Sequence, residues 1–292
     1  MVKVPEKDFM FRGVLKDHAV RFAFGNFKEL ATTGIIKHDT DPVAARLLGG
    51  ALSAGALMSV LLNEEERYSI RIDYTAPAAG LMMDISGRGD VRGFIRNAHV
   101  MTEVDSIESA CGDESTVTVT KSCNGKVLNS GQAKSAFILP EAALSYFFSV
   151  SDQVESEICS TLRFRPDPAS PVESAFTLMI QALPDCNLDF FNAMREKMFT
   201  PGAAEILLSE TLGAEEKIGE LFKYLCEEQS VPALDFVQVD SPRFFCPCSA
   251  EKLWETAKVM LGEADFAKLL EENPDPAIRC QFCNTEHHYP RS

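Results

Sequence analysis

Four cysteines near the C-terminal end of the chain are the residues most able to do chemistry. They form two close pairs, a Cys-x-Cys at Cys246 and Cys248 and a Cys-x-x-Cys at Cys280 and Cys283, with 31 residues between the pairs. Two such pairs can place four sulfurs around one ion, which is the tetrahedral all-thiolate set that structural zinc favours. The pattern therefore predicts one Zn²⁺ per chain, bound by these four cysteines.

The first pair brings its two sulfurs unusually close together. Without a metal, adjacent thiolates repel each other and their pKa values rise, so such a pair either holds a metal or oxidises. A closed site of four cysteines more often serves only to hold the chain together. From the spacing alone, a purely structural zinc site therefore remains open.

Composition limits the partners. The chain has 292 residues and a net charge of -15, which argues against a nucleic-acid partner because phosphate binding depends on clustered Lys and Arg. The first eight residues have no secretory signal pattern, and the apolar run at 41–63 suits a buried helix better than a membrane span. We expect a cytoplasmic protein whose nine cysteines are thiols or metal ligands; the roles of Cys186 and Cys226 stay open.

Residues 1–183 predict an α+β domain with a mainly antiparallel sheet packed with helices. Alternating or apolar runs between glycine-rich turns are typical of strands, and Asn124-Gly125 is a strong hairpin signal. Asp41 followed by Pro42 predicts the start of a helix. The expected strands are a hairpin within 9–27, then 68–74, 81–86, 91–95, 116–120, 126–139 and 158–165, and the expected helices are 43–62, 140–150 and 172–183.

Residues 184–243 are expected to form a charged helical linker. Twelve side chains between Asp185 and Arg243 are acidic and five are basic, and strand signals are almost absent. Apolar residues at helical spacing indicate either ordinary helices that cover a core or a segment that docks weakly and can be released. The six that we single out are Phe191, Met194, Met198, Phe199, Leu221 and Phe222.

Residues 244–292 are expected to form a small zinc-binding module. Ser249 predicts the N-cap of a helix that ends at Gly262, and a second short helix precedes the turn at 273–276. A module of fewer than fifty residues has too small a core to persist alone, so its zinc is expected to hold it together.

These features together resemble the heat shock protein 33 family over almost the entire chain. The most specific marks are the four cysteines with Ser249 and Asn284, and the segments 90–94 (Asp-Val-Arg-Gly-Phe), 151–153 and 181–184 also match the family. The departures are Ala175-Phe176-Thr177, where relatives tend toward glycine, Pro247 between the first two ligands, and the additional Cys186 and Cys226.

The resemblance implies an ATP-independent holdase chaperone, which is not an enzyme and is inactive when reduced and zinc-bound. On oxidation the zinc would be released, and disulfides would join Cys246 with Cys248 and Cys280 with Cys283. The linker would then expose its six apolar side chains to unfolding client proteins, whose aggregation it would prevent. The family also implies a homodimer in the oxidised state.

Two other functions are compatible with a zinc-binding module. A zinc ribbon could bind nucleic acid, although the module has eight acidic and only five basic side chains. An enzyme could use the zinc or the dithiol of Cys280 and Cys283, with His287 or His288 close enough to replace a ligand. Four thiolates close the coordination sphere that catalytic zinc keeps open, so we expect no hydrolase here.

Overall fold

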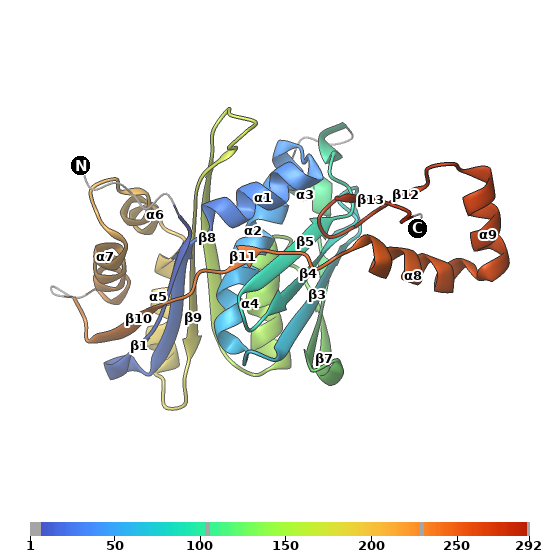
Figure 1. Ribbon diagram of the computed structural model, residues 1–292. Coiled ribbons are helices and arrows are strands. Elements are labelled where there is room, and N and C mark those ends of the chain that lie inside the picture. The colour runs from blue at the N-terminus through green and yellow to red at the C-terminus, as the bar shows by residue number, and fades with distance from the viewer. Residues whose placement is uncertain (1–6, 103–105, 228–230, 291–292) are drawn as a thin grey trace.

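The computed structural model describes residues 7–102, 106–227 and 231–290, which form two layered sheets, covering helices and a projecting C-terminal module (Figure 1). Residues 1–6, part of the stretch where we expect no secretory signal, lie outside the described residues. The predicted α+β class is confirmed, since the strands of both large sheets pair mainly antiparallel and helices pack against them.

A five-stranded sheet contains the N-terminal hairpin. Its strand order is β10-β1-β2-β9-β8, and the pairing of β1 with β2 confirms the hairpin predicted within residues 9–27. The 3-10 turn η1 (Lys16–His18) joins the two hairpin strands. The bounds are β1 (Phe9–Leu15), β2 (Val20–Asn26), β8 (Ser156–Phe164), β9 (Val172–Ala182) and β10 (Leu234–Val239).

A six-stranded sheet has the order β11-β5-β4-β3-β6-β7. Asn124 and Gly125 form the predicted turn between β6 and β7, both with positive φ, which these two residue types tolerate. Strand β7 ends at Ser135, short of the predicted residue 139. The bounds are β3 (Glu66–Tyr74), β4 (Gly80–Ser86), β5 (Asp90–Ile95), β6 (Ser115–Cys123), β7 (Lys126–Ser135) and β11 (Arg243–Phe244).

Helix α2 (Pro42–Met58) starts as predicted. The Asp41 side chain accepts a hydrogen bond of 2.9 Å from the Ala44 N–H, and Pro42 occupies the first helical turn. The remaining helices are α1 (Lys28–His38), α3 (Ile107–Cys111), α4 (Pro140–Ser151), α5 (Leu188–Lys197), α6 (Pro201–Leu208), α7 (Ala214–Cys226), α8 (Ala250–Leu261) and α9 (Glu263–Glu272), with 3-10 turns η2 (Ser59–Leu61) and η3 (Val100–Thr102).

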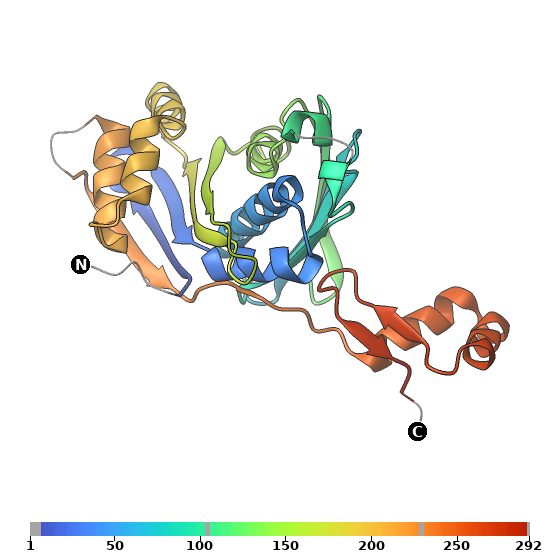
Figure 2. The ribbon, with the colours of Figure 1, turned by 90° about the horizontal axis from the view of Figure 1, so that it is seen from above.

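Helix α2 lies between the two sheets, as Figure 2 shows from above. Its buried side chains join one apolar cluster with Ala23 and Met179 of the five-stranded sheet and Ile70 and Leu81 of the six-stranded sheet. The stretch Pro42–Leu61 is long and apolar enough to cross a membrane, but 89% of the apolar window within it is buried inside the fold. It is therefore the core helix that its composition predicts.

The helix predicted at 172–183 is wrong. The structure has strand β9 here, which pairs with β2 on one side and β8 on the other, so it is a central strand. Nearly all its side chains are buried, on both faces. A strand buried on both faces lacks the period-two alternation of apolar and polar residues that separates a strand from a helix in sequence.

The expectation of almost no strand in 184–243 is also wrong. Strand β10 pairs antiparallel with β1, and β11, which begins at Arg243, pairs parallel with β5. Leu234 and Phe236 alternate with Asp235, which was the local signal for β10, but its pairing partner lies far earlier in the chain. The domain boundaries at 183/184 and 243/244 stay predictions.

Candidate metal centre

The structure brings the four predicted cysteines together. Cys246 and Cys248 follow β11 and precede α8, while Cys280 and Cys283 lie between β12 (Ala277–Arg279) and β13 (Glu286–His288). All four sulfurs lie within 4.8 Å of one another. The Cys246 and Cys280 sulfurs are 3.7 Å apart, and those of Cys248 and Cys283 are 3.4 Å apart.

Local backbone chemistry shapes both halves of this site. The Ser249 side chain accepts a hydrogen bond from the Lys252 N–H and caps α8, directly after the first cysteine pair. In the second pair, Asn284 adopts a left-handed conformation with φ 56°, and its N–H donates to the Cys280 carbonyl at 2.8 Å. This turn reverses the chain, so both cysteines of the pair face the same point.

The separations of the sulfurs fit a metal ion. Four sulfurs about 2.3 Å from a zinc ion at the centre of a regular tetrahedron would lie about 3.8 Å apart. The Cys246–Cys280 and Cys248–Cys283 separations, 3.7 and 3.4 Å, are close to that edge length. Soft thiolate ligands favour zinc over magnesium or calcium, and a set of four leaves no open position for substrate. These cysteines could therefore hold one metal ion in a closed site.

The thiols of this cluster influence one another's ionisation. Burial, followed by hydrogen bonding to neighbouring sulfurs, raises the pKa of Cys248, and burial also raises the pKa of Cys280. Burial opposes the ionisation of Cys283 as well, but Thr285, whose hydroxyl lies 3.3 Å from the sulfur, helps to lower the pKa of Cys283 to about 7. A cation at the centre would allow all four to ionise together.

The rest of the C-terminal module has a small aromatic core. Trp254 packs edge-on against Tyr289 and Phe266, with ring centroids 5.3 and 6.1 Å away, and its indole N–H donates to the His287 carbonyl at 3.2 Å. Figure 2 shows α8 and α9 projecting from the body of the molecule. Such a small core agrees with the expectation that a metal stabilises the module.

Five of the six apolar linker residues that we singled out are buried against the five-stranded sheet. Phe191, Met194, Met198, Leu221 and Phe222 join one apolar cluster with side chains of β1, β2 and β9. For example, the rings of Phe22 and Phe222 lie 4.5 Å apart between centroids. The sixth residue, Phe199, is 59% exposed and lies outside the cluster. Helices α5–α7 thus cover one face of this sheet.

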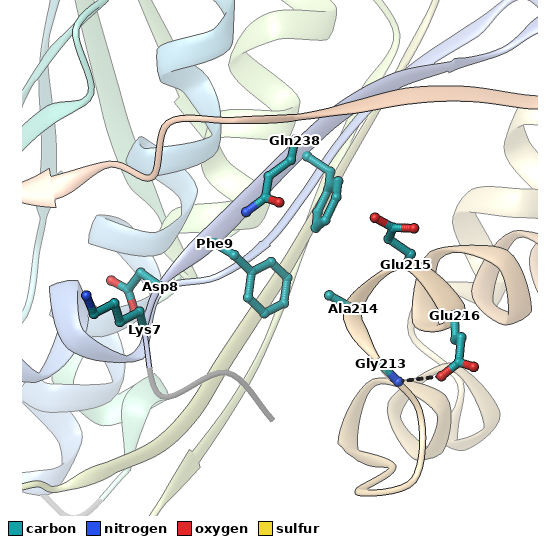
Figure 3. A pocket seen from close by; sticks show the side chains of 9 residues that line it. Lys7, Asp8, Phe9, Gly213, Ala214, Glu215, Glu216 and Gln238 are labelled. Atoms are coloured by element: carbon teal, nitrogen blue, oxygen red, sulfur yellow. Dashed lines mark hydrogen bonds between the residues drawn. The ribbon is translucent and has the colours of Figure 1, made fainter. Parts of the chain in front are cut away.

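Helices α5–α7 leave a cavity near the edge of the five-stranded sheet, where α7 begins. A cavity of about 540 Å³ lies between β1, β10 and the N-terminus of α7, and Figure 3 shows Phe9 directed from β1 toward it. On the helix side, the Gly213 N–H donates to the Glu216 side chain at 2.7 Å. The acidic first turn of α7 therefore lies opposite Phe9 and Phe11 of β1 and leaves the cavity between them open.

Comparison with known proteins decides the family. The family model described as Hsp33 protein matches residues 8–290. The chain belongs to the Hsp33 family. Two relatives, each called 33 kDa chaperonin, are 25% identical to it: that of Bacillus cytotoxicus over 98% of this chain and 96% of its own, and that of Geobacillus kaustophilus over 98% and 95%.

The crystal structure of an Hsp33 homolog, the 33 kDa chaperonin of Thermotoga maritima, has the same fold. It superposes with a TM-score of 0.79 at 19% identity, covering 96% of this chain and 94% of that chain. The family resemblance drawn from the sequence is thus confirmed, and membership of Hsp33 supports a chaperone function.

Three residues that contact the cluster escaped the sequence analysis as functional residues. Arg92, noted only within an Hsp33 family segment, places its Nη1 3.3 Å from the Cys246 sulfur. Phe282, between the cysteines of the second pair, lies under that guanidinium, and Thr285 contacts Cys283. His287, considered as a substitute ligand, has its Nε2 3.3 Å from the Cys248 sulfur but is not one of the four residues of the cluster.

Proposed function

We propose that this Hsp33 family member is a cytoplasmic, ATP-independent holdase chaperone controlled by oxidation of its cysteine cluster. In the reduced state the cluster binds one Zn²⁺ and the protein is inactive. Oxidation releases the zinc, and the protein then binds unfolding proteins and prevents their aggregation. The observation that carries this proposal is the gathering of four sulfurs within 4.8 Å in a module with little core of its own.

The energetics favour loss of structure when the metal leaves. Structural zinc contributes roughly 10–16 kcal/mol of apparent binding free energy in small zinc-binding peptides. Within the described part of the module, the buried apolar residues are only Trp254, Phe266, Pro276, Cys280 and Cys283. A core of that size cannot replace so large a contribution, so metal release is expected to unfold residues 246–290.

The client-binding surface is proposed to be the apolar cluster between the linker helices and the five-stranded sheet. Phe191, Met194, Met198, Leu221 and Phe222 would become accessible together with the sheet face beneath them. Flexible methionine and aromatic side chains can repack against many apolar partners, which suits clients of no fixed shape. Phe199 is already exposed and would extend this surface.

Oxidation is proposed to give disulfides within each pair, Cys246 with Cys248 and Cys280 with Cys283, followed by dimerisation. The sulfur–sulfur contacts with hydrogen-bond geometry in the thiol form run across the pairs instead, from Cys246 to Cys280 and from Cys248 to Cys283. Peptide mapping of the oxidised protein distinguishes the two arrangements, because only cross-paired disulfides link the segments around 246–248 and 280–283.

The test is an aggregation assay with a chemically denatured client enzyme, followed by light scattering. We expect peroxide-treated protein to suppress scattering at near-equimolar ratio and the reduced, zinc-loaded protein not to do so. Zinc and thiol titration of the same samples should give one zinc lost for four thiols consumed. The Cys186→Ser/Cys226→Ser variant, which keeps the cluster, serves as the control and should behave like wild type. Equal suppression by oxidised and reduced protein would refute the proposal.

A further inference from the structure

One arginine of the main fold reaches the cysteine cluster. Arg92 lies on β5, and its Nη1 donates a hydrogen bond of 3.3 Å to the Cys246 sulfur. Its Nε and Nη2 donate to the same oxygen of Asp84 at 3.1 and 2.6 Å, which fixes the orientation of the guanidinium. The side chain is half-buried, so solvent screens these contacts less than it would at an open surface.

The same guanidinium also covers the loop of the second cysteine pair. Its central carbon lies 4.0 Å from the ring centroid of Phe282, which is the geometry of a cation–π contact. Phe94, two residues after Arg92 on β5, packs edge-on against that ring at 5.4 Å. One strand of the six-stranded sheet therefore contacts both cysteine pairs.

Helix α1 completes the contact surface with two hydrogen bonds to the same loop. His38 Nε2 donates to the Phe282 carbonyl at 3.1 Å, since a carbonyl can only accept. The Asn284 side-chain amide donates to the Lys37 carbonyl at 2.8 Å. The loop is thus held against β5 and α1, and Arg92 is the residue of this surface that also reaches a cysteine sulfur.

We propose that Arg92 is a positioning residue that couples the docking of the C-terminal module to the charge of the Cys246 sulfur. The inference rests on the proposed function and names how the cluster is connected to the main fold. A thiolate is an anionic acceptor, so its hydrogen bond from Arg92 is charge-assisted and strong. A disulfide sulfur is neutral, so the same contact weakens when Cys246 is oxidised.

The chemistry of that change is balanced with hydrogen peroxide as oxidant. Two cysteine thiolates give up two electrons, the O–O bond breaks, and with two protons the products are one S–S bond and two water molecules. The reaction removes the negative charge from the sulfur that Arg92 contacts. Arg92 therefore stabilises the docked module while Cys246 is a thiolate and stabilises it less once Cys246 is in a disulfide.

The experiment compares wild type with Arg92→Met, Arg92→Lys and the control Arg88→Met. Arg88 is an exposed arginine in the turn before β5, so its loss removes the same charge without touching the cluster. Partners that hydrogen-bond to metal ligands typically change metal affinity by about 10- to 100-fold when mutated. We expect Arg92→Met to transfer zinc to a chelator about 10-fold faster, Arg92→Lys to be intermediate, and Arg88→Met to match wild type.

Hydrogen exchange of the reduced, zinc-loaded proteins provides the second measurement. Arg92→Met should increase exchange in residues 277–290 and at the end of α1. If Arg92→Met folds poorly, Phe282→Ala replaces it in this measurement, because it leaves β5 and the cysteines intact. This variant should increase exchange in the same segments. Wild-type rates of zinc transfer and exchange in a folded Arg92→Met protein would overturn the inference. Neither measurement requires oxidant or client, so a failed chaperone assay would refute the proposed function and leave this result separate.

Discussion

Asp8 shows how a single partly buried carboxylate can join two elements. It lies just before β1, and its two oxygens accept hydrogen bonds of 2.8 and 2.9 Å from the Glu29 and Leu30 N–H groups at the start of α1. Burial opposes the charged form more strongly than these hydrogen bonds favour it. The pKa of Asp8 is therefore raised from 3.8 to about 6.

This shift predicts a pH dependence of stability. Because the folded pKa lies above the unfolded value, the stabilising contribution is complete below about pH 4 and is lost as the pH rises through 6. As the pH rises from 5.5 to 7.0, we expect the ionisation of Asp8 to lower the free energy of unfolding by roughly 1 kcal/mol. Urea unfolding at both pH values should show this difference in wild type and not in Asp8→Asn. The same difference in both proteins would contradict the assignment.

At the scale of elements, a buried lysine holds the linker helices together. Lys217 on α7 is only 2% exposed, and its ammonium donates to the carbonyls of Ile206, Leu207 and Ser209 at the end of α6. It also lies 5.1 Å from the ring centroid of Phe176 on β9. The Lys217 side chain therefore binds the C-terminal carbonyls of α6, connects α6 to α7 and contacts the sheet that both helices cover.

Lys217→Met is expected to loosen this cover. The carbonyls of Leu207 and Ser209 lose the ammonium donor, while that of Ile206 keeps the Ser209 N–H. A buried acceptor left without a partner costs about 1–3 kcal/mol. We expect the variant to be roughly 2 kcal/mol less stable and its α6–α7 amides to exchange faster with solvent. If the linker covers the client surface, the reduced variant should also suppress aggregation partly. Lys223→Met is the matched control on α7, because the side-chain contact of Lys223 among the described residues is an exposed ion pair of 3.8 Å with Glu220. Wild-type exchange in Lys217→Met would contradict this role.

At the scale of the whole molecule, the two parts of the fold depend on different forces. The body has two large apolar clusters, around α2 and beneath the linker helices, whereas the module relies on a few aromatic side chains and its cysteines. The body and the module should therefore respond differently to loss of the metal.

Metal removal is expected to unfold the module and leave the body folded. Trp254 is the only tryptophan of the chain and lies inside the module, so its fluorescence reports on this part alone. A chelator under reducing conditions should shift its emission to the red, while amides of β3 and β4 keep their protection from hydrogen exchange. Return of the emission after zinc is added back provides the control. An unchanged Trp254 emission in the metal-free protein would show that the module is stable alone.

The sequence alone determined the features that depend on neighbouring residues. The cap at Asp41, the turn at Asn124-Gly125 and the cap at Ser249 follow from local backbone chemistry, and each appears where it was predicted. The gathering of the cysteines was also foreseeable, because paired spacing and thiolate chemistry allow few other arrangements. The zinc itself and the disulfide pairs remain proposals.

Tertiary structure alone decided the features that depend on distant partners. An apolar run such as 172–182 fits a buried helix or a buried strand, and only the positions of β2 and β8 on either side make it β9. The contact between Arg92 and Cys246 joins residues 154 positions apart, and no local pattern encodes it. Pairing across such distances depends on how the whole chain packs, so it becomes visible only in the folded molecule.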